Sequence, residues 1–267
     1  MLPQYLETGL ACILGAILGS FYTALASRIL YYYYGPGRKL KGWLWRPLVS
    51  RRWAAILGRP SHCQNCGTEI RGLFLWPLLG YLAARGRCRS CKHPIGWWTL
   101  AGEIYAALLL PLLLHFGASW LLALVWTCFA GHLYISVATD TVFLRLDHEN
   151  ALVLASLGLL GVVIESGSDW HRLQWHLWAG PGLAALFYLL HVFYKKGLGF
   201  GDVILVGVLG FALGLPWALF MIQIGGAFAI LYIYLVARDH RAPAPLGTGL
   251  AIGWLVCLPL SFVADWF

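Results

Sequence analysis

The chain has 267 residues, of which 60% are hydrophobic and 11% are charged, and its mean hydropathy is +0.72. A soluble domain of this length needs far more charge to cover its surface. These values exclude a single soluble domain and indicate an all-α membrane protein, whose helices satisfy their own backbone hydrogen bonds in lipid.

Apolar segments that can form membrane-spanning helices recur along the chain, since about 20 apolar residues cross the hydrocarbon core. The first begins at Leu6 and ends at Leu30. Because no basic region precedes this long apolar run, we interpret it as a retained span rather than a cleaved signal peptide. After a polar stretch, seven more segments follow, at residues 100–116, 119–138, 151–164, 175–194, 203–215, 217–237 and 246–264. The sequence therefore predicts about eight transmembrane helices.

The polar stretch between the first two spans is strongly basic. From Arg28 to Trp98 the chain has thirteen Lys or Arg residues and one acid, Glu69, whereas the rest has six basic residues. A basic segment can bind nucleic acid, but in a membrane protein it more often marks a cytoplasmic loop that faces anionic lipid. We therefore expect a first transmembrane helix at 1–30, a cytoplasmic basic domain at 31–98 and a multi-pass membrane domain at 99–267, with no nucleic-acid partner.

The remaining basic residues favour one orientation in the membrane. If residues 31–98 are cytoplasmic, the N-terminus lies outside and only Arg172 falls in an outer loop. Alternation of the eight spans then places the other five basic residues in cytoplasmic loops: Arg145, Lys195, Lys196, Arg238 and Arg241. This distribution agrees with the positive-inside rule and supports the number of spans.

Two Cys-x-x-Cys pairs lie in the basic domain, Cys63 with Cys66 and Cys88 with Cys91. Such pairs form zinc ribbons when about 15–20 residues separate them, and 21 residues intervene here. Two disulfides or four free thiols are the alternatives, but a reducing cytoplasm disfavours disulfides and nearby basic residues favour thiolates. We predict a structural zinc ion held by the four thiolates, with the neighbouring His62 and His93 as substitute ligands.

Acidic residues are rare, so each can be considered separately. Five fall at span ends or in loops, where we expect them to be solvated: Glu7, Glu165, Asp169, Asp239 and Asp265. Asp140 and Asp202 instead stand at the predicted cytoplasmic ends of two different spans. An ionisable residue at the bilayer is costly, which makes each a candidate functional residue.

Two aspartates that meet at one depth can carry out hydrolysis. Adjacent carboxylates do not readily ionise together, so one of them holds a proton. The ionised group can activate a water molecule while the protonated group donates to a scissile carbonyl, which is the chemistry of an aspartic protease. The glycines in Gly199-Phe-Gly201-Asp202 permit close backbone approach. Asp202 can also be the N-cap of the span that begins at Val203, and this role is compatible with catalysis.

Gly199-Phe-Gly201-Asp202 is similar to the GxGD motif of the type IV prepilin peptidases. Other segments resemble the same family over nearly the whole chain. Residues 15–21 resemble its N-terminal GxxxGSF motif, and residues 61–66 and 85–95 resemble its cysteine domain. Glu103 falls in its post-cysteine segment, and residues 244–247 resemble its C-terminal PFGP turn.

The resemblance implies an intramembrane aspartic endopeptidase of the bacterial inner membrane. Members of the family remove the short basic leader from type IV prepilins or pseudopilins on the cytoplasmic side, and many then methylate the new N-terminus with S-adenosylmethionine. By this resemblance Asp140 and Asp202 are the catalytic pair, Gly199 and Gly201 support the motif, and Glu103 is a candidate for substrate binding or methyl transfer.

The chain also departs from the family pattern. Asp147 stands where the family's first aspartate motif has Pro, which leaves Asp147 as an alternative partner of Asp202, although the spacing favours Asp140. Ile204 replaces a Lys, and Thr248 replaces the last Pro of PFGP. These changes keep open a catalytically altered scaffold or assembly factor of a pilus or secretion system. A proton-relaying transporter is a third hypothesis, but its acids would lie near the bilayer midplane.

Overall fold

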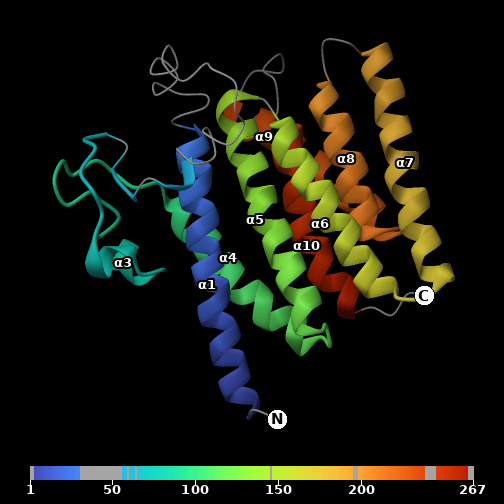
Figure 1. The fold of residues 1–267 in the computed structure, drawn as a ribbon. Coiled ribbons are helices and arrows are strands. Elements are labelled where there is room, and N and C mark those ends of the chain that lie inside the picture. Colours follow the sequence, from blue (N-terminus) through green and yellow to red (C-terminus); the bar gives the residue numbers. More distant parts are fainter. Residues whose placement is uncertain are drawn as a thin grey trace. The chain divides into compact units, whose positions relative to one another are not determined.

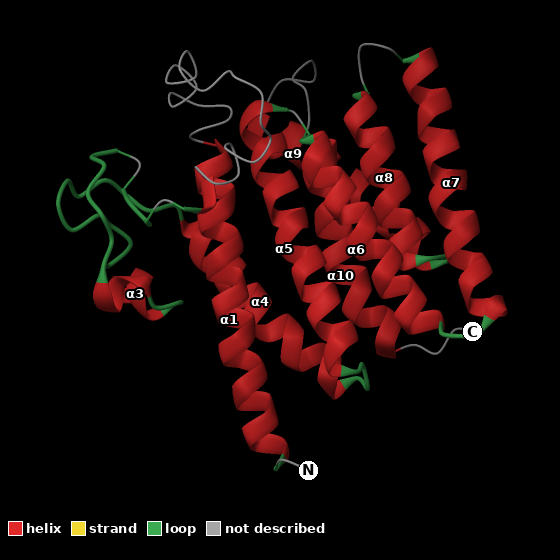
Figure 2. Cartoon of the chain, viewed as in Figure 1, coloured by secondary structure: helices red, strands yellow, loops and turns green. Residues whose placement is uncertain are grey.

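The structure is a computed structural model, and it describes residues 3–30, 56–58, 60–63, 65–144, 146–194, 198–237 and 245–263 (Figure 1). These residues form helices joined by loops and turns, and the described part of the chain contains two isolated β-bridges but no strand (Figure 2). They divide into two compact units, Met1–Pro111 and Leu112–Phe267, and the boundary falls within one helix, α4 (Trp97–His115). The predicted all-α fold class is confirmed.

Seven of the described helices are long and apolar enough to cross a membrane. They are α1 (Gln4–Ile29), α4, α5 (Trp120–Phe143), α6 (His148–Ser166), α7 (Trp170–Phe193), α9 (Trp217–Tyr232), which continues as the π-helix η4 (Ile233–Ala237), and α10 (Leu246–Val263). The remaining predicted span corresponds to α8 (Phe200–Leu213), which has 14 residues. At 1.5 Å per residue α8 is about 21 Å long, shorter than the roughly 30 Å hydrocarbon core.

Polar residues extend two of the helices, α5 and α7, beyond the bounds that hydropathy predicts. The predicted end of α5 is residue 138, but the helix continues to Phe143 because the hydroxyls of Thr139 and Thr141 donate to carbonyls one turn earlier. The predicted start of α7 is residue 175, but the helix begins at Trp170 because the Asp169 carboxylate accepts two backbone N–H groups of the first turn.

In the first unit, two glycines of α1 allow close contact with α4. A Cβ atom on Gly19 would lie 2.9 Å from the Cα atom of Glu103, and one on Gly15 would overlap the backbone of Ala106. Small residues at such contacts let two membrane helices approach closely. The two short helices η3 (Gly72–Leu75) and α3 (Leu79–Ala83) lie between the cysteine pairs.

In the second unit, α5 to α10 pack around an aromatic core. The rings of Phe129 on α5 and Trp254 on α10 are stacked with centroids 4.5 Å apart, and Trp126 lies against both. All three side chains are fully buried. Gly249 on α10 makes close backbone contact with Gly225 on α9. This packing fixes the relative positions of the helices, whose alternating directions bring the end of α5 to the beginnings of α6, α8 and α10.

Part of the predicted organisation lies outside the described residues. The undescribed positions include residues 31–55, which form most of the first half of the basic domain, and five basic residues used for the orientation: Arg145, Lys195, Lys196, Arg238 and Arg241. The boundaries of the three predicted domains and the orientation therefore stay predictions.

Candidate active site and metal centre

Asp140 lies in the last turn of α5 and is 6% exposed. Its Oδ2 atom accepts hydrogen bonds from the backbone nitrogen of Thr248 at 2.9 Å and from the Thr248 hydroxyl at 3.1 Å. The same hydroxyl lies 3.1 Å from the Thr141 hydroxyl. Thr248 belongs to the first turn of α10, so two donors from a distant helix converge on one carboxylate oxygen.

Asp202 lies in the first turn of α8, where its Oδ2 atom accepts a hydrogen bond of 3.2 Å from the backbone nitrogen of Gly199. The N-cap of α8 is Gly199, so the prediction that Asp202 caps this helix is wrong. The helix begins three residues earlier than that prediction required, at Phe200. Gly201 lets this turn lie against Leu146, because a Cβ atom there would be 3.0 Å from the Leu146 side chain.

The carboxylates of Asp140 and Asp202 meet beside Gly247. A Cβ atom on Gly247 would lie 3.0 Å from Oδ2 of Asp140 and 3.4 Å from Oδ1 of Asp202. The two oxygens are therefore no farther apart than these two distances together, and the groups interact electrostatically. Gly247 and Thr248 were recognised in the sequence only as parts of a turn motif, and nothing there indicated that they contact Asp140.

Asp147, the alternative partner, has a different position. It is the N-cap of α6, and its Oδ1 atom accepts a hydrogen bond of 3.0 Å from the backbone nitrogen of Glu149. Asp147 is 6% exposed, so this capping bond satisfies a buried carboxylate at the helix end where a negative charge is favoured. The structure thus brings Asp140 to Asp202 and gives Asp147 a capping bond at the start of α6.

A buried polar network behind Asp140 was missed by the sequence analysis. The Asn150 side chain on α6 donates to the His132 carbonyl and to the Ser136 hydroxyl, both at 2.8 Å, and its Oδ1 atom lies 2.8 Å from Nδ1 of His132. Ser136 is one helical turn before Asp140 on α5. The network ties the start of α6 to α5, and an Asn directly before the apolar span at 151–164 was the signal that could have revealed it.

The four cysteines of the first unit form a cluster with metal-site geometry. Their sulfur atoms all lie within 4.8 Å of one another, and Sγ of Cys63 is 3.7 Å from Cys91 while Sγ of Cys66 is 3.8 Å from Cys88. A tetrahedral zinc ion with bonds of about 2.3 Å requires sulfur–sulfur separations of about 3.8 Å. All four are free thiols, so the disulfide alternative is wrong, and the cluster can hold a metal ion.

The local backbone and hydrogen bonds prepare these thiols as ligands. The backbone nitrogens of Gly67 and Lys92 donate to the carbonyls of Cys63 and Cys88 in two matching turns, at 2.8 and 3.0 Å. A hydrogen bond with the Thr68 side chain lowers the pKa of Cys66 to about 6, and a backbone hydrogen bond of Cys91 lowers that of Cys88. Burial raises the pKa of Cys63 to about 11, which a bound cation would oppose.

Two other predicted residues have structural contacts in this unit. The Glu103 carboxylate on α4 is 6% exposed and accepts a hydrogen bond of 2.7 Å from the backbone nitrogen of Leu78. Leu78 has a left-handed backbone with φ of 59°, so Glu103 anchors a strained position between the cysteine pairs. Glu69 forms an ion pair with Arg71, and His62 lies beside the carbonyl of Pro60 rather than in the cysteine cluster.

Comparisons with known proteins show what the chain is similar to. The sequence model of the Bacterial Peptidase A24 N-terminal domain matches residues 13–116, and that of the Type IV leader peptidase family matches residues 126–234. A Prepilin leader peptidase/N-methyltransferase of Pseudomonas putida is 31% identical, over 97% of this chain and 92% of its own length. A protein of that name from Stutzerimonas stutzeri is 30% identical, over 93% of this chain and 89% of its own length. One from Bacillus subtilis strain 168 is 27% identical, over 90% of this chain and 89% of its own length. No solved structure matches the chain.

Proposed function

Because the chain belongs to the type IV leader peptidase family, we propose that it is a multi-pass membrane endopeptidase that cuts the leader from type IV prepilins or pseudopilins and methylates the new N-terminus. The observation that carries this proposal is the meeting of Asp140 and Asp202 beside Gly247. The names of the relatives supply the substrate class and the methyl transfer.

The hydrogen bonds around the pair suggest which carboxyl group holds the shared proton. Asp140 accepts two hydrogen bonds from Thr248, whereas Asp202 accepts one from Gly199. Hydrogen bonds to a carboxylate favour its ionised form, and two close carboxylates share one proton. We therefore assign the negative charge to Asp140 and the proton to Asp202.

Peptide hydrolysis follows from this assignment. Asp140 takes a proton from a water molecule, whose oxygen attacks the scissile carbonyl carbon, while Asp202 gives its proton to the carbonyl oxygen. The tetrahedral intermediate then breaks its C–N bond, and the proton taken by Asp140 passes to the leaving amine. The proton of the intermediate's hydroxyl returns to Asp202, so the pair regains its starting state without a covalent enzyme intermediate.

We further propose that this chemistry lies at the cytoplasmic side. Except for Arg172, the basic residues of the second unit follow α5, precede α8 or precede α10 in the sequence, in the loops at the end where the aspartate pair lies. Loops rich in Lys and Arg stay in the cytoplasm, so the N-terminus of the chain lies outside. This arrangement suits a substrate with an apolar helix in the bilayer and a basic leader in the cytoplasm.

The cysteine cluster is proposed to bind a structural zinc ion. Its sulfur separations fit tetrahedral coordination by four thiolates, which leaves no open position for a substrate. Bound zinc would crosslink the two cysteine turns. S-adenosylmethionine is proposed as the methyl donor because the relatives are named N-methyltransferases, and we assign none of the described residues to it.

Co-expression with a prepilin tests the proposed function. Leader removal, scored by mass spectrometry, is expected for the wild type and for Asp147→Asn, and is expected to be lost in Asp140→Asn and Asp202→Asn. Asp147→Asn is the matched control, because Asn also caps helices. The mass of the product also reports an added methyl group. Cleavage by both dyad variants would refute the aspartic-protease mechanism and favour the scaffold alternative.

A further inference from the structure

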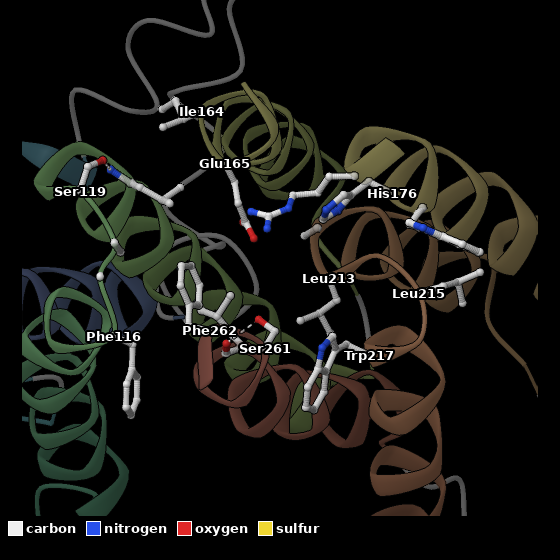
Figure 3. Close-up of a pocket in the computed structure, with 17 residues that line it drawn as sticks. Phe116, Ser119, Ile164, Glu165, His176, Leu213, Leu215, Trp217, Ser261 and Phe262 are labelled. Carbon is white, nitrogen blue, oxygen red and sulfur yellow. Dashed lines mark hydrogen bonds between the residues drawn. The ribbon is translucent and has the colours of Figure 1, made fainter. Parts of the chain in front are cut away.

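A second polar site lies where α6 ends and α7 begins, at the end of the second unit opposite the aspartate pair. Figure 3 shows the side chains that line it. A cavity of about 400 Å³ opens among the beginnings of α5, α7 and α9 and the ends of α6, α8 and α10. Its wall is apolar at Leu213, Trp217 and Phe262 and polar at Glu165, Arg172 and His176. Glu165 was expected to be solvated, but it lines this cavity. The volume lies within the range of small-molecule sites, about 300–1,000 Å³.

The cavity holds an acidic and a basic side chain that do not pair directly. Glu165 on α6 and Arg172 on α7 both line it and attract each other electrostatically. No ion pair within 4.0 Å joins them among the described residues. Because the two side chains are separated, a ligand with both a positive and a negative group can bind between them. Each ligand group then faces the side chain of opposite charge.

Neighbouring polar groups add to this potential for binding. The Ser166 hydroxyl, next to Glu165 in the chain, is buried and has no hydrogen-bond partner in the described part of the chain. The buried Trp126 indole interacts with Glu165 itself. Nδ1 of His176 lies 2.8 Å from the Phe211 carbonyl oxygen. A carbonyl only accepts, so Nδ1 carries the hydrogen, and Nε2 of the neutral ring is left as an acceptor for a ligand donor. Glu165 and His176 can thus both accept from a ligand cation.

The position of the cavity along the helices indicates where such a ligand comes from. Tryptophans gather at this end of the unit, at or near the first residues of α5, α7 and α9: Trp120, Trp170, Trp175 and Trp217. Tryptophan is enriched where a membrane protein crosses the headgroup layer. With the dyad's end in the cytoplasm, this end lies at the headgroups of the outer leaflet.

We propose that this cavity binds the headgroup of a zwitterionic phospholipid of the ethanolamine class from the outer leaflet. The ligand's ammonium group meets Glu165 and His176, and its phosphate meets Arg172. The acyl chains leave along the apolar wall at Leu213 and Trp217. The carboxylate of Glu165 disfavours anionic lipids, so the cavity distinguishes lipids by charge.

Native mass spectrometry of the full chain in detergent tests this proposal. The chain is mixed with equal amounts of dioleoyl phosphatidylethanolamine and dioleoyl phosphatidylglycerol, and the retained lipids are counted. The wild type is expected to prefer the ethanolamine lipid. Arg172→Gln should weaken retention roughly tenfold or more, as expected for the loss of one charge-assisted hydrogen bond. Glu165→Gln should remove the preference while anionic lipid is still retained.

Matched controls separate this site from general effects. Glu69→Gln and Arg71→Gln remove another acid–base pair, which is surface-exposed in the other unit, and should leave lipid retention unchanged. Circular dichroism melting checks that each variant is folded. Equal retention of both lipids by the wild type, or no change in Glu165→Gln and Arg172→Gln, would overturn the proposal. Displacement of the lipid by equimolar soluble phosphoethanolamine would overturn the assignment to a lipid.

Discussion

Thr248 provides a direct test of where the pair's proton resides. Three substitutions remove its two donors to Asp140 stepwise. Thr248→Ser keeps the backbone N–H and the hydroxyl, Thr248→Val keeps the N–H alone, and Thr248→Pro removes both. The helix tolerates proline this close to its start, because the first N–H groups of a helix have no partner within it. The proline ring takes the place of the hydrogen, so the Asp140 carboxylate has to move away from it.

The expected magnitudes follow from the number of donors on each carboxylate. A hydrogen bond to a charged group contributes about 1.5–3 kcal/mol, and about 1.4 kcal/mol corresponds to tenfold. With two donors on Asp140 and one on Asp202, the proposed mechanism puts the charge on Asp140. In Thr248→Val each of the two carboxylates has one donor, so about half of the molecules carry the charge on Asp140 and kcat falls about twofold. In Thr248→Pro only Asp202 keeps a donor, so the charge moves to Asp202 and kcat falls about 10- to 100-fold.

The assay is cleavage of a purified prepilin by the full chain in detergent, with kcat and KM determined separately. Thr248→Ser should match the wild type, and KM should stay constant through the series, because the substrate's apolar helix does not sense the position of the proton. Thr141→Val is the matched control. It removes a hydroxyl that contacts Thr248 and the Val137 carbonyl, so kcat should fall no more than about twofold.

Two outcomes would refute this reasoning. Wild-type kcat in Thr248→Pro would mean that the Thr248 donors do not determine the position of the proton. An equal loss in Thr248→Ser and Thr248→Pro, accompanied by a rise in KM, would mean that any change here distorts the site instead.

Three further predictions concern the contacts around the two sites. Gly247→Ala should abolish prepilin cleavage without lowering the melting temperature by more than a few degrees, because the new Cβ would lie 3.0 Å from the Asp140 carboxylate; retained cleavage would contradict the geometry. Cys88→Ser should lose the bound zinc measured by elemental analysis, while Cys128→Ser, a change within α5, should keep it. Asn150→Ala should destabilise the fold by about 1–3 kcal/mol in denaturant titration, because it leaves buried partners unsatisfied.

Much of the helical framework was predictable, because the cost of burying polar groups in lipid determines where spans can lie. Each of the eight predicted spans corresponds to a helix, and the rarity of acids identified Asp140 and Asp202 before any contact was known. The spacing of the two cysteine pairs likewise anticipated the cluster. These predictions depend on local composition and spacing, which the sequence contains explicitly.

The contacts between helices were not predictable in the same way. Hydropathy does not reveal which helix faces contact each other. The hydrogen bonds from Thr248 to Asp140 therefore become visible only in the structure, where α10 packs against α5 around Phe129 and Trp254. The cavity at Glu165 was missed for the same reason. Its charges belong to successive helices whose ends looked like ordinary solvated loops in the sequence.

Two departures from the family pattern argue against an inactive scaffold. Where the family pattern has Pro, this chain has Asp147 and Thr248, and both side chains make specific hydrogen bonds. Asp147 caps α6 and so fixes the segment that contacts Gly201, while Thr248 donates directly to Asp140. Random substitution around a site that is no longer used would leave a buried carboxylate without hydrogen-bond donors, which costs free energy of folding. The substitutions instead supply partners to the site, which is the pattern expected of a pair that still carries a charge.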